Sequence, residues 1–322
     1  MSEKSVDPIP RILVVGFGAV GIIYSYLLEH HGKAQITAVA RSKYDAILPH
    51  LHQVVRRIED AYPFEFDYVF VCTKVVPGIS STPAILRPVI QQLPRSSPTF
   101  VLLQNGLGVE KELQEAIESQ VESNATPSAR PLIISCALYI MANVLENGTV
   151  IHVASDKVIA GAYRPDTNTS NAAQSQVVDA RISAFVDLLN SSGFEASSVK
   201  DIAAAKFNKN LWNASIGMDS KSSQLAYGLV KNMMEEMVAI GRSLGYDETY
   251  LPATVVEDKI NAEFQRVSTT RTPQEFKASA LLDITNNKPF ELEVILGEVV
   301  RLGKQQGCSV TVCGLPARSY CF

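Results

Sequence analysis

Short apolar runs alternate with helical patterns through the first third of the chain. The continuous apolar runs predict buried strands of a parallel sheet that is covered on both faces. These runs are Ile12–Val15, Gln35–Ala40, Asp67–Cys72 and Thr99–Leu103. Helices are predicted at Ala19–His30 and at Ala84–Leu93, although Pro88 lies inside the second. Strands that alternate with helices indicate an α/β fold with a Rossmann-like, doubly wound sheet.

The middle of the chain mixes strands with polar stretches. Leu132–Met141 and Thr149–Val153 are predicted strands on either side of a glycine turn, which indicates an antiparallel part of the sheet. The polar stretches Val121–Arg130 and Arg164–Gln176 predict surface loops. An amphipathic helix is predicted at Val177–Leu189.

From about Ser198 the pattern becomes helical only. The predicted helices are Ala203–Ile216, Leu229–Leu244, Ala253–Arg266 and Phe290–Gln305. We therefore predict two domains, a Rossmann-like doubly wound sheet domain in residues 1–197 and an all-helical domain in residues 198–322.

The first apolar run leads into a glycine-rich turn with the spacing G-x-G-x-x-G. The first glycine permits the tight turn, the second lets a pyrophosphate approach the backbone, and the third allows the helix to pack closely on the strand. This motif is weak alone, but here a strand precedes it and a helix follows, whose first amide N–H groups face the anion. The expected cofactor-binding residues are Gly16, Phe17, Gly18, Ala19, Val20 and Gly21. The alternative is a glycine-rich structural turn.

The charge after the second strand favours a phosphorylated cofactor. Arg41 lies twenty residues beyond Gly21, where NAD-binding proteins usually carry an acidic residue for the ribose 2′-hydroxyl. Arg41 and Lys43 would instead attract a 2′-phosphate. The sequence therefore predicts NADPH as the cofactor. The alternative for Arg41 is an ordinary solvated arginine at the end of a strand.

Polar residues follow two further strands at the edge where ligands bind in such sheets. Lys74 comes after Asp67–Cys72, so we expect it to face the cofactor. Asn105 comes after Thr99–Leu103 and offers both a donor and an acceptor to a ligand above the sheet. The alternative for Asn105 is a turn asparagine before glycine.

Candidate catalytic groups lie in the helical half. Lys209, Asn213 and Gly217 are four residues apart and share one face of a predicted helix. A ketone that accepts a hydride becomes an alkoxide and needs a proton, which an ammonium group can supply. Lys209 suits that role, and partial burial would lower its pKa towards neutrality. The alternative is a helix lysine that reaches solvent.

Glu291 is predicted in the first turn of the last long helix, after Pro289. The amide dipoles there favour an ionised carboxylate, which could hold a substrate hydroxyl or fix the ammonium of Lys209. The alternative is a surface glutamate that only complements the helix dipole.

Composition and charge exclude several classes of function. The chain has 322 residues and a net charge of −4, with scattered basic residues, so nucleic acid is not an expected partner. The five cysteines are widely spaced without metal-ligand pairs, so we expect reduced thiols and no metal site. No apolar signal region precedes the first strand, so we expect a soluble, cytoplasmic protein that binds no membrane. The sequence leaves the oligomeric state open, with a homodimer as one option.

Taken together, these motifs resemble those of the ketopantoate (2-dehydropantoate) 2-reductase family, in a form similar to its fungal members. The resemblance covers about residues 11–307. The matching motifs are Gly16–Gly21, Cys72–Lys74, Gln104–Gly106, Glu146–His152, Lys209 with Asn213, and Ser279 with Asp283 followed by Glu291. The resemblance implies that Lys209 is the proton donor and that Glu291 helps to bind and orient. It also implies substrate contacts by Asn105 and Asn213, and by Ser279 with the substrate carboxylate.

The resemblance implies NADPH-dependent reduction of a small-molecule 2-keto acid, with 2-dehydropantoate as the favoured substrate. Two features depart from the family pattern. Gly217 stands where the family has a second asparagine, and the end of the chain after Gly307 lacks the expected closing helix. These departures favour two alternatives, a catalytically impaired homologue that still binds NADPH, or a reductase of a different keto acid.

Overall fold

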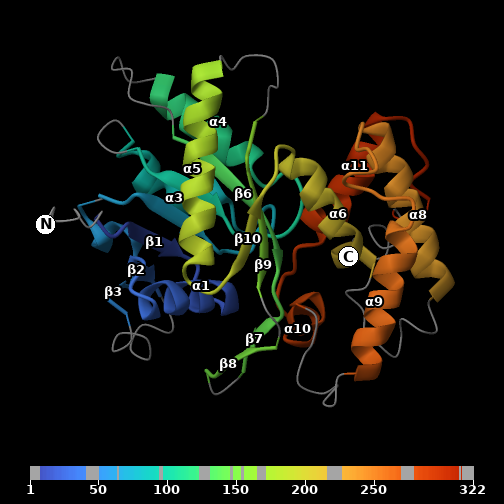
Figure 1. The fold of residues 1–322 in the computed structure, drawn as a ribbon, viewed down its shortest axis with the longest axis horizontal. Coiled ribbons are helices and arrows are strands. Elements are labelled where there is room, and N and C mark those ends of the chain that lie inside the picture. Colours follow the sequence, from blue (N-terminus) through green and yellow to red (C-terminus); the bar gives the residue numbers. More distant parts are fainter. Residues whose placement is uncertain are drawn as a thin grey trace, which may run out of the picture.

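The computed structural model describes residues 8–40, 51–63, 65–93, 97–122, 131–145, 148–153, 156–164, 172–215, 227–269, 279–311 and 313. Within these ranges a sheet with helices on both faces is followed by a helical part that lies beside it (Figure 1). The predicted α/β class, a Rossmann-like sheet followed by helices, is confirmed. None of the described helices is both long and apolar enough to cross a membrane.

The main sheet has eight strands in the order β10-β9-β6-β5-β4-β1-β2-β3. They are β1 (Arg11–Val15), β2 (Gln35–Val39), β3 (Gln53–Val55), β4 (Tyr68–Val71), β5 (Thr99–Leu102), β6 (Ile133–Tyr139), β9 (Lys157–Ala162) and β10 (Glu195–Ser198). Strands β1 to β6 pair in parallel, β9 runs antiparallel to β6, and β10 runs parallel to β9. Strands β2 and β3 lie on one side of β1, and the strands from β4 onward lie on its other side. Doubly wound sheets bind nucleotides where the strand order reverses in this way.

Successive residues of β1 enter two separate cores, because neighbouring side chains of a strand point to opposite faces. Ile12 and Val14 pack beneath α1 and α5, whereas Leu13 and Val15 pack beneath α3 and α4. All four side chains are at most 2% exposed. Full burial of an aliphatic side chain stabilises the fold by roughly 1.5–3 kcal/mol, which explains why this strand is apolar throughout.

The helices of the sheet part lie on both faces of the sheet (Figure 1). They are α1 (Ala19–His30), α3 (Thr82–Ile90), α4 (Lys111–Glu122), α5 (Ala172–Asn190) and the 3-10 helix η2 (Ile58–Ala61). Helix α1 has the predicted bounds, and α3 continues past Pro88 to Ile90.

The helical part begins with α6 (Ile202–Ser215), which packs on the sheet at β6 and β9. A side chain at Gly161 in β9 would have its Cβ only 2.8 Å from the Cβ of Ile202, so strand and helix touch directly. The helices that follow are α8 (Tyr227–Ser243), α9 (Val255–Thr269), α10 (Ser279–Thr285), the π-helix η3 (Glu293–Gly297) and α11 (Glu298–Gln305). Because α6 contacts both the sheet and this helical core, it can present side chains at the border between them.

Several predicted elements are wrong in detail. Helix α4 extends to Glu122 and helix α5 begins at Ala172, so both polar stretches predicted as loops contain helical residues. The antiparallel neighbour of β6 is β9, which was not predicted, whereas β8 (Val150–His152) pairs with β7 (Ala142–Val144) in a separate two-stranded sheet. The sequence also gave no sign of β10 or α10. Strand β10 runs to Ser198, and the domain boundary at residues 197 and 198 stays a prediction.

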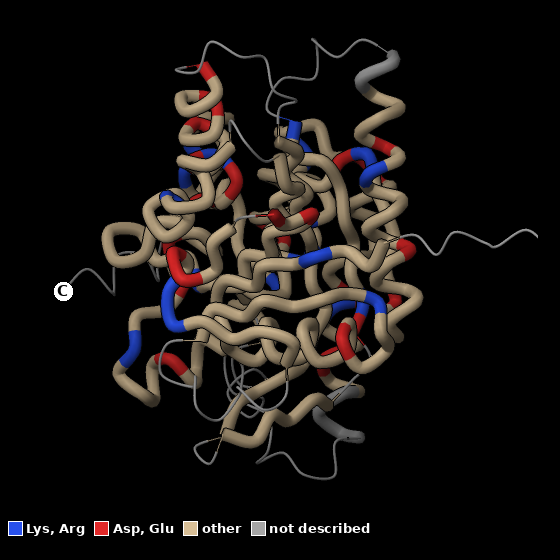
Figure 2. Tube along the Cα trace, turned by 90° about the vertical axis from the view of Figure 1, so that its left-hand side faces the viewer, with Lys and Arg blue, Asp and Glu red and all other residues tan. Residues whose placement is uncertain are grey.

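Acidic and basic positions are interspersed along the described chain (Figure 2). The described residues contain no group of three His, Cys, Asp or Glu side chains that could hold a metal ion.

Candidate active site

The glycine turn joins β1 to α1 with very little room. Gly16 has a φ of +97°, and a Cβ there would lie 2.6 Å from the backbone nitrogen of Thr73. A Cβ on Gly21 would collide with the carbonyl oxygen of Gly16. Both positions therefore need glycine for the protein's own packing, as the motif predicts.

Gly18 is different, because a Cβ there would meet no protein atom within 4 Å. The protein's packing does not require glycine at this position, whereas a ligand that approaches the backbone would. No side chain caps the start of α1 at Gly18, so the first amide N–H groups of the helix are available to an anion. Phe17 and Val20 pack at the edge of the core beneath α1, and Ala19 begins the helix. The turn thus fits the pyrophosphate of a dinucleotide. Arg41, on which the prediction of NADPH in preference to NADH rests, lies outside the described residues.

Lys209 lies on α6 and points its ammonium at the end of β5, where its Nζ donates a hydrogen bond to Oδ1 of Asn105. Burial lowers the pKa of Lys209 to about 7; Glu291 opposes this shift, and the positive charges of Lys206 and Lys259 add to it. A lysine in this state gives up its proton near neutral pH, which an ordinary solvated lysine does not.

Glu291 is 6% exposed and lies near enough to Lys209 for the two charges to interact. Its Oε1 accepts a hydrogen bond of 3.2 Å from the backbone N–H of Val75. Burial raises the pKa of Glu291, against the effects of that hydrogen bond and of Lys74 and Lys209. Helical residues begin at Leu292, and the carbonyl oxygen of Glu291 accepts the backbone N–H of Ile295 at 3.0 Å. Glu291 therefore lies immediately before the helix, and the predicted start at Phe290 is two residues too early.

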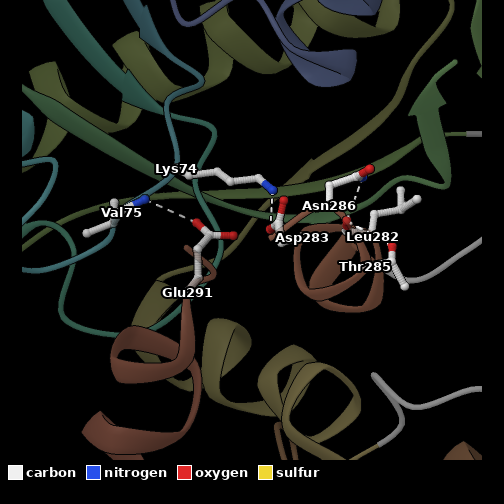
Figure 3. A network of polar contacts seen from close by, with 7 residues as sticks. All are labelled: Lys74, Val75, Leu282, Asp283, Thr285, Asn286 and Glu291. Atoms are coloured by element: carbon white, nitrogen blue, oxygen red, sulfur yellow. Dashed lines mark hydrogen bonds and ion pairs between the residues drawn. The ribbon is translucent and has the colours of Figure 1, made fainter. Parts of the chain in front are cut away.

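Lys74 extends from the end of β4 across to α10, where it forms an ion pair with Asp283 (Figure 3). Asp283 is 9% exposed in this pair and Lys74 is 47% exposed. Figure 3 shows Glu291 beside the same segment, bonded to Val75. Two consecutive residues after β4 therefore contact two carboxylates of the helical part. Lys74 was expected to face the cofactor. In the structure it lies at that edge of the sheet, where it pairs with Asp283.

A small recess of about 10 Å³, enough for about one water molecule and partly open to solvent, lies between the sheet edge and α6. It is lined by Gln104, Asn105, Gly106, Cys136, Ala137, Lys206, Lys209, Asn210 and Asn213. The four α6 residues in this set have the spacing of one helix face. Asn105, Lys209 and Asn213 are thus brought together as predicted, whereas Ser279 is an exposed residue at the start of α10, one turn before Asp283. Gly217 lies outside the described residues.

Sequence reasoning named Gln104 and Asp283 only as parts of motifs, without a role, and missed Asn210 and Lys206. Gln104 donates from Nε2 to the carbonyl oxygen of Thr73 at 2.8 Å and so ties the ends of β4 and β5 together. Asn210 donates to the carbonyl oxygen of Ile295 at 2.6 Å and ties α6 to η3. Asp283 and Lys206 each hold an ion pair. For Asn210 and Lys206 the only available signal was position, because both lie on the helix that carries Lys209.

Comparison with known proteins decides the family. The family model described as "Ketopantoate reductase PanE/ApbA" matches residues 12–165, and the model of its C-terminal part matches residues 201–315. The chain belongs to the ketopantoate reductase family. The resemblance stated from the motifs is therefore confirmed, and with it the expectation of an oxidoreductase.

The family relatives are distant. The chain is 24% identical over 343 residues to an uncharacterized protein of Saccharomyces cerevisiae, covering 92% of this chain and 88% of that one. It resembles the crystal structure of 2-dehydropantoate 2-reductase from Methylococcus capsulatus with a TM-score of 0.73 and 23% identity, covering 96% of each chain. A ternary structure of D-mandelate dehydrogenase with NADH and anilino(oxo)acetate has a TM-score of 0.70 and 17% identity, again covering 96% of each chain. At these identities the structural likeness shows the shared fold.

Proposed function

We propose that the protein uses NADPH to reduce the ketone of a 2-keto acid, with 2-dehydropantoate as the favoured substrate and Lys209 as the proton donor. The observation that carries this proposal is the state of Lys209, whose pKa is lowered to about 7 in a recess at the nucleotide-binding edge of the sheet. A general acid works best when its pKa lies near the working pH.

A nicotinamide dinucleotide fits the residues that are present. The Gly16–Gly21 turn and the uncapped start of α1 would hold the pyrophosphate, and the open space at Gly18 leaves room for it. The bound cofactor supplies a hydride. NADPH in preference to NADH rests on Arg41 in the sequence, and D-mandelate dehydrogenase, of similar fold, is known with NADH. Dissociation constants for both cofactors would test this choice.

The protein's own residues then supply the proton that the reduction requires. As the carbonyl carbon takes up the hydride, its oxygen gains negative charge and takes a proton from Nζ of Lys209, which becomes a neutral amine and later regains a proton from water. Asn105 accepts from Lys209 through Oδ1, so its amide N–H groups stay free to donate to a ligand. Asn213 lies one turn along the same helix face and reaches the same recess.

The remaining residues bind the substrate or adjust the pKa of Lys209. Glu291 favours the ammonium form of Lys209 and so limits how far burial lowers its pKa. Ser279 is proposed to meet the substrate carboxylate, as the family resemblance implies. It lies one helical turn from Asp283, whose partner Lys74 comes from the cofactor edge, so an anion at Ser279 would lie near a lysine.

The deciding experiment is a panel of 2-keto acids offered with NADPH to the purified protein, with NADPH consumption as the readout. Turnover of 2-dehydropantoate above the other acids supports the proposal, and preference for another acid selects the second alternative. A folded protein that binds NADPH, shown by thermal stabilisation, yet turns over no acid in the panel would be the impaired homologue that Gly217 suggests.

Location and assembly are separate proposals. We expect the protein in the cytoplasm, which imaging of a tagged chain in cells would check. Light scattering of the purified protein would show whether it forms a homodimer.

A further inference from the structure

A buried ion pair lies one helical turn from Lys209 on the same helix. Nζ of Lys206 is 2.5 Å from Oε1 of Glu110 and 3.0 Å from Oγ of Ser135. The Ser135 hydroxyl donates to the same carboxylate oxygen. The side chains of Lys206 and Glu110 are only 5% and 7% exposed. Charges so far removed from water are stable only because each has the other.

Three parts of the chain meet at this pair. Glu110 comes five residues after Asn105, at the end of the segment that leads from β5 to α4, while Ser135 lies in β6 and Lys206 in α6. The ion pair therefore fastens the segment that carries Asn105 to the helix that carries Lys209. Because Lys209 also bonds directly to Asn105, the segment and the helix are joined at two points.

The pair presents its positive end to the recess. Lys206 lines the recess together with Lys209, whereas Glu110 does not. Residues three apart on a helix lie on the same face, so the two ammonium groups are neighbours. The negative charge of Glu110 lies behind Lys206 and cancels only part of its effect on Lys209. Glu110, 2.5 Å away, is the partner that this buried ammonium needs.

We propose that Lys206 is a positioning residue for Lys209: it holds the Asn105 segment against α6, and its buried charge, maintained by Glu110, promotes proton release from the neighbouring ammonium. This inference rests on the proposed function, since it concerns the acid assigned there. The other charged groups that face Lys209 are Glu291, from the segment before η3, and Lys259, from α9. Glu291 opposes the effect of Lys206, and Lys259 adds to it.

The test measures the titration of Lys209 without turnover. The protein is treated with an amine-acylating reagent over a range of pH, and peptide mass spectrometry follows acylation at Lys209. Only the neutral amine reacts, so the pH dependence reports its pKa. The variants are Lys206→Met and the double variant Lys206→Met with Glu110→Gln. The double variant removes both buried charges at once and so avoids leaving one unpaired.

We expect the pKa of Lys209 to rise by about one unit in Lys206→Met, since the loss of a unit charge roughly 8–10 Å away in a medium of effective dielectric constant ~20 has an effect of this order. Acylation at pH 7.5 would then be about threefold slower than in the natural protein. The double variant should show a smaller rise, of roughly a few tenths of a unit, because it also removes the opposing charge of Glu110. If the single variant fails to fold, the double variant still decides. Lys231→Met, which removes an exposed ion pair on α8, is the matched control and should leave the titration unchanged.

An unchanged titration of Lys209 in the double variant would overturn the inference and leave the ion pair as a purely structural link. The measurement also separates this inference from the proposed function. A shifted titration in a protein that reduces no keto acid would support the role of Lys206 and reject the proposed reaction. Turnover of a keto acid together with an unshifted titration would support the proposed reaction and reject the role of Lys206.

Discussion

The rate of reduction should fall as the pH rises through neutrality, because the proposed acid must hold its proton to work. With the pKa of Lys209 at about 7, about nine tenths of the protein carries the ammonium at pH 6, half at pH 7 and one tenth at pH 8. We therefore expect kcat/KM for the keto acid to fall about tenfold from pH 6 to pH 8, and about tenfold for each further unit. The cause is burial, which disfavours the charged form, so that the proton leaves at lower pH than from an ordinary lysine, whose pKa is about 10.4.

The assay is the initial rate of NADPH consumption at constant ionic strength, with NADPH kept saturating at each pH. The dissociation constant of NADPH over the same range is the control, because weaker cofactor binding would also lower the rate. A kcat/KM that stays constant from pH 6 to pH 9 while the cofactor stays bound would refute the reasoning, since it would mean that Lys209 either keeps an ordinary pKa or takes no part in the proton transfer.

Further variants test the roles of Lys209, of Arg41 and of two glycines in the nucleotide turn. Lys209→Ala should lower the rate at saturating substrate by about 10²–10⁴-fold with NADPH affinity nearly intact, and Lys209→Arg should not restore the rate because a guanidinium keeps its proton. A rate near that of the natural protein in either variant, measured by NADPH consumption, would remove Lys209 from the mechanism. Arg41→Asp should raise the NADPH dissociation constant and narrow the gap to NADH, since a charge-assisted phosphate contact is worth roughly 1.5–3 kcal/mol; unchanged NADPH affinity by titration would contradict the cofactor choice. Gly18→Ala should weaken NADPH binding but leave the melting temperature of the cofactor-free protein nearly unchanged. Gly21→Ala should lower that melting temperature by several degrees, because only a Cβ at Gly21 collides with the backbone. Equal melting temperatures of the two variants in calorimetry would count against this account.

The nucleotide half of the site was predictable because its signals are local. The apolar run of β1, the glycine spacing and the start of α1 follow one another within twenty residues, and each reflects a constraint on neighbouring backbone. Strands buried on both faces are apolar throughout, and this pattern is visible in the sequence. One of the missed elements lacked such a signal. Strand β10, with the sequence Glu-Ala-Ser-Ser, is an edge strand with little burial, so no apolar pattern marks it.

The catalytic half was predictable only as a set of separate candidates. The spacing of Lys209 and Asn213 placed them on one helix face, and the family resemblance added roles. That Lys209 meets Asn105, 104 residues earlier, follows from how α6 packs on β6 and β9. The lowered pKa of Lys209 arises from the same packing, because burial depends on what surrounds a group in space.

The sequence by itself determined the fold class, the nucleotide turn and the residue types available for proton transfer, because these depend on short-range backbone geometry and on the chemistry of each side chain. Only the tertiary structure decided which charges face one another. The ion pairs of Lys74 with Asp283 and of Lys206 with Glu110 join residues 209 and 96 positions apart, and no local pattern distinguishes these lysines from solvated ones. The physical reason is that electrostatic interactions and desolvation depend on distance through space, which is fixed when the helices pack on the sheet.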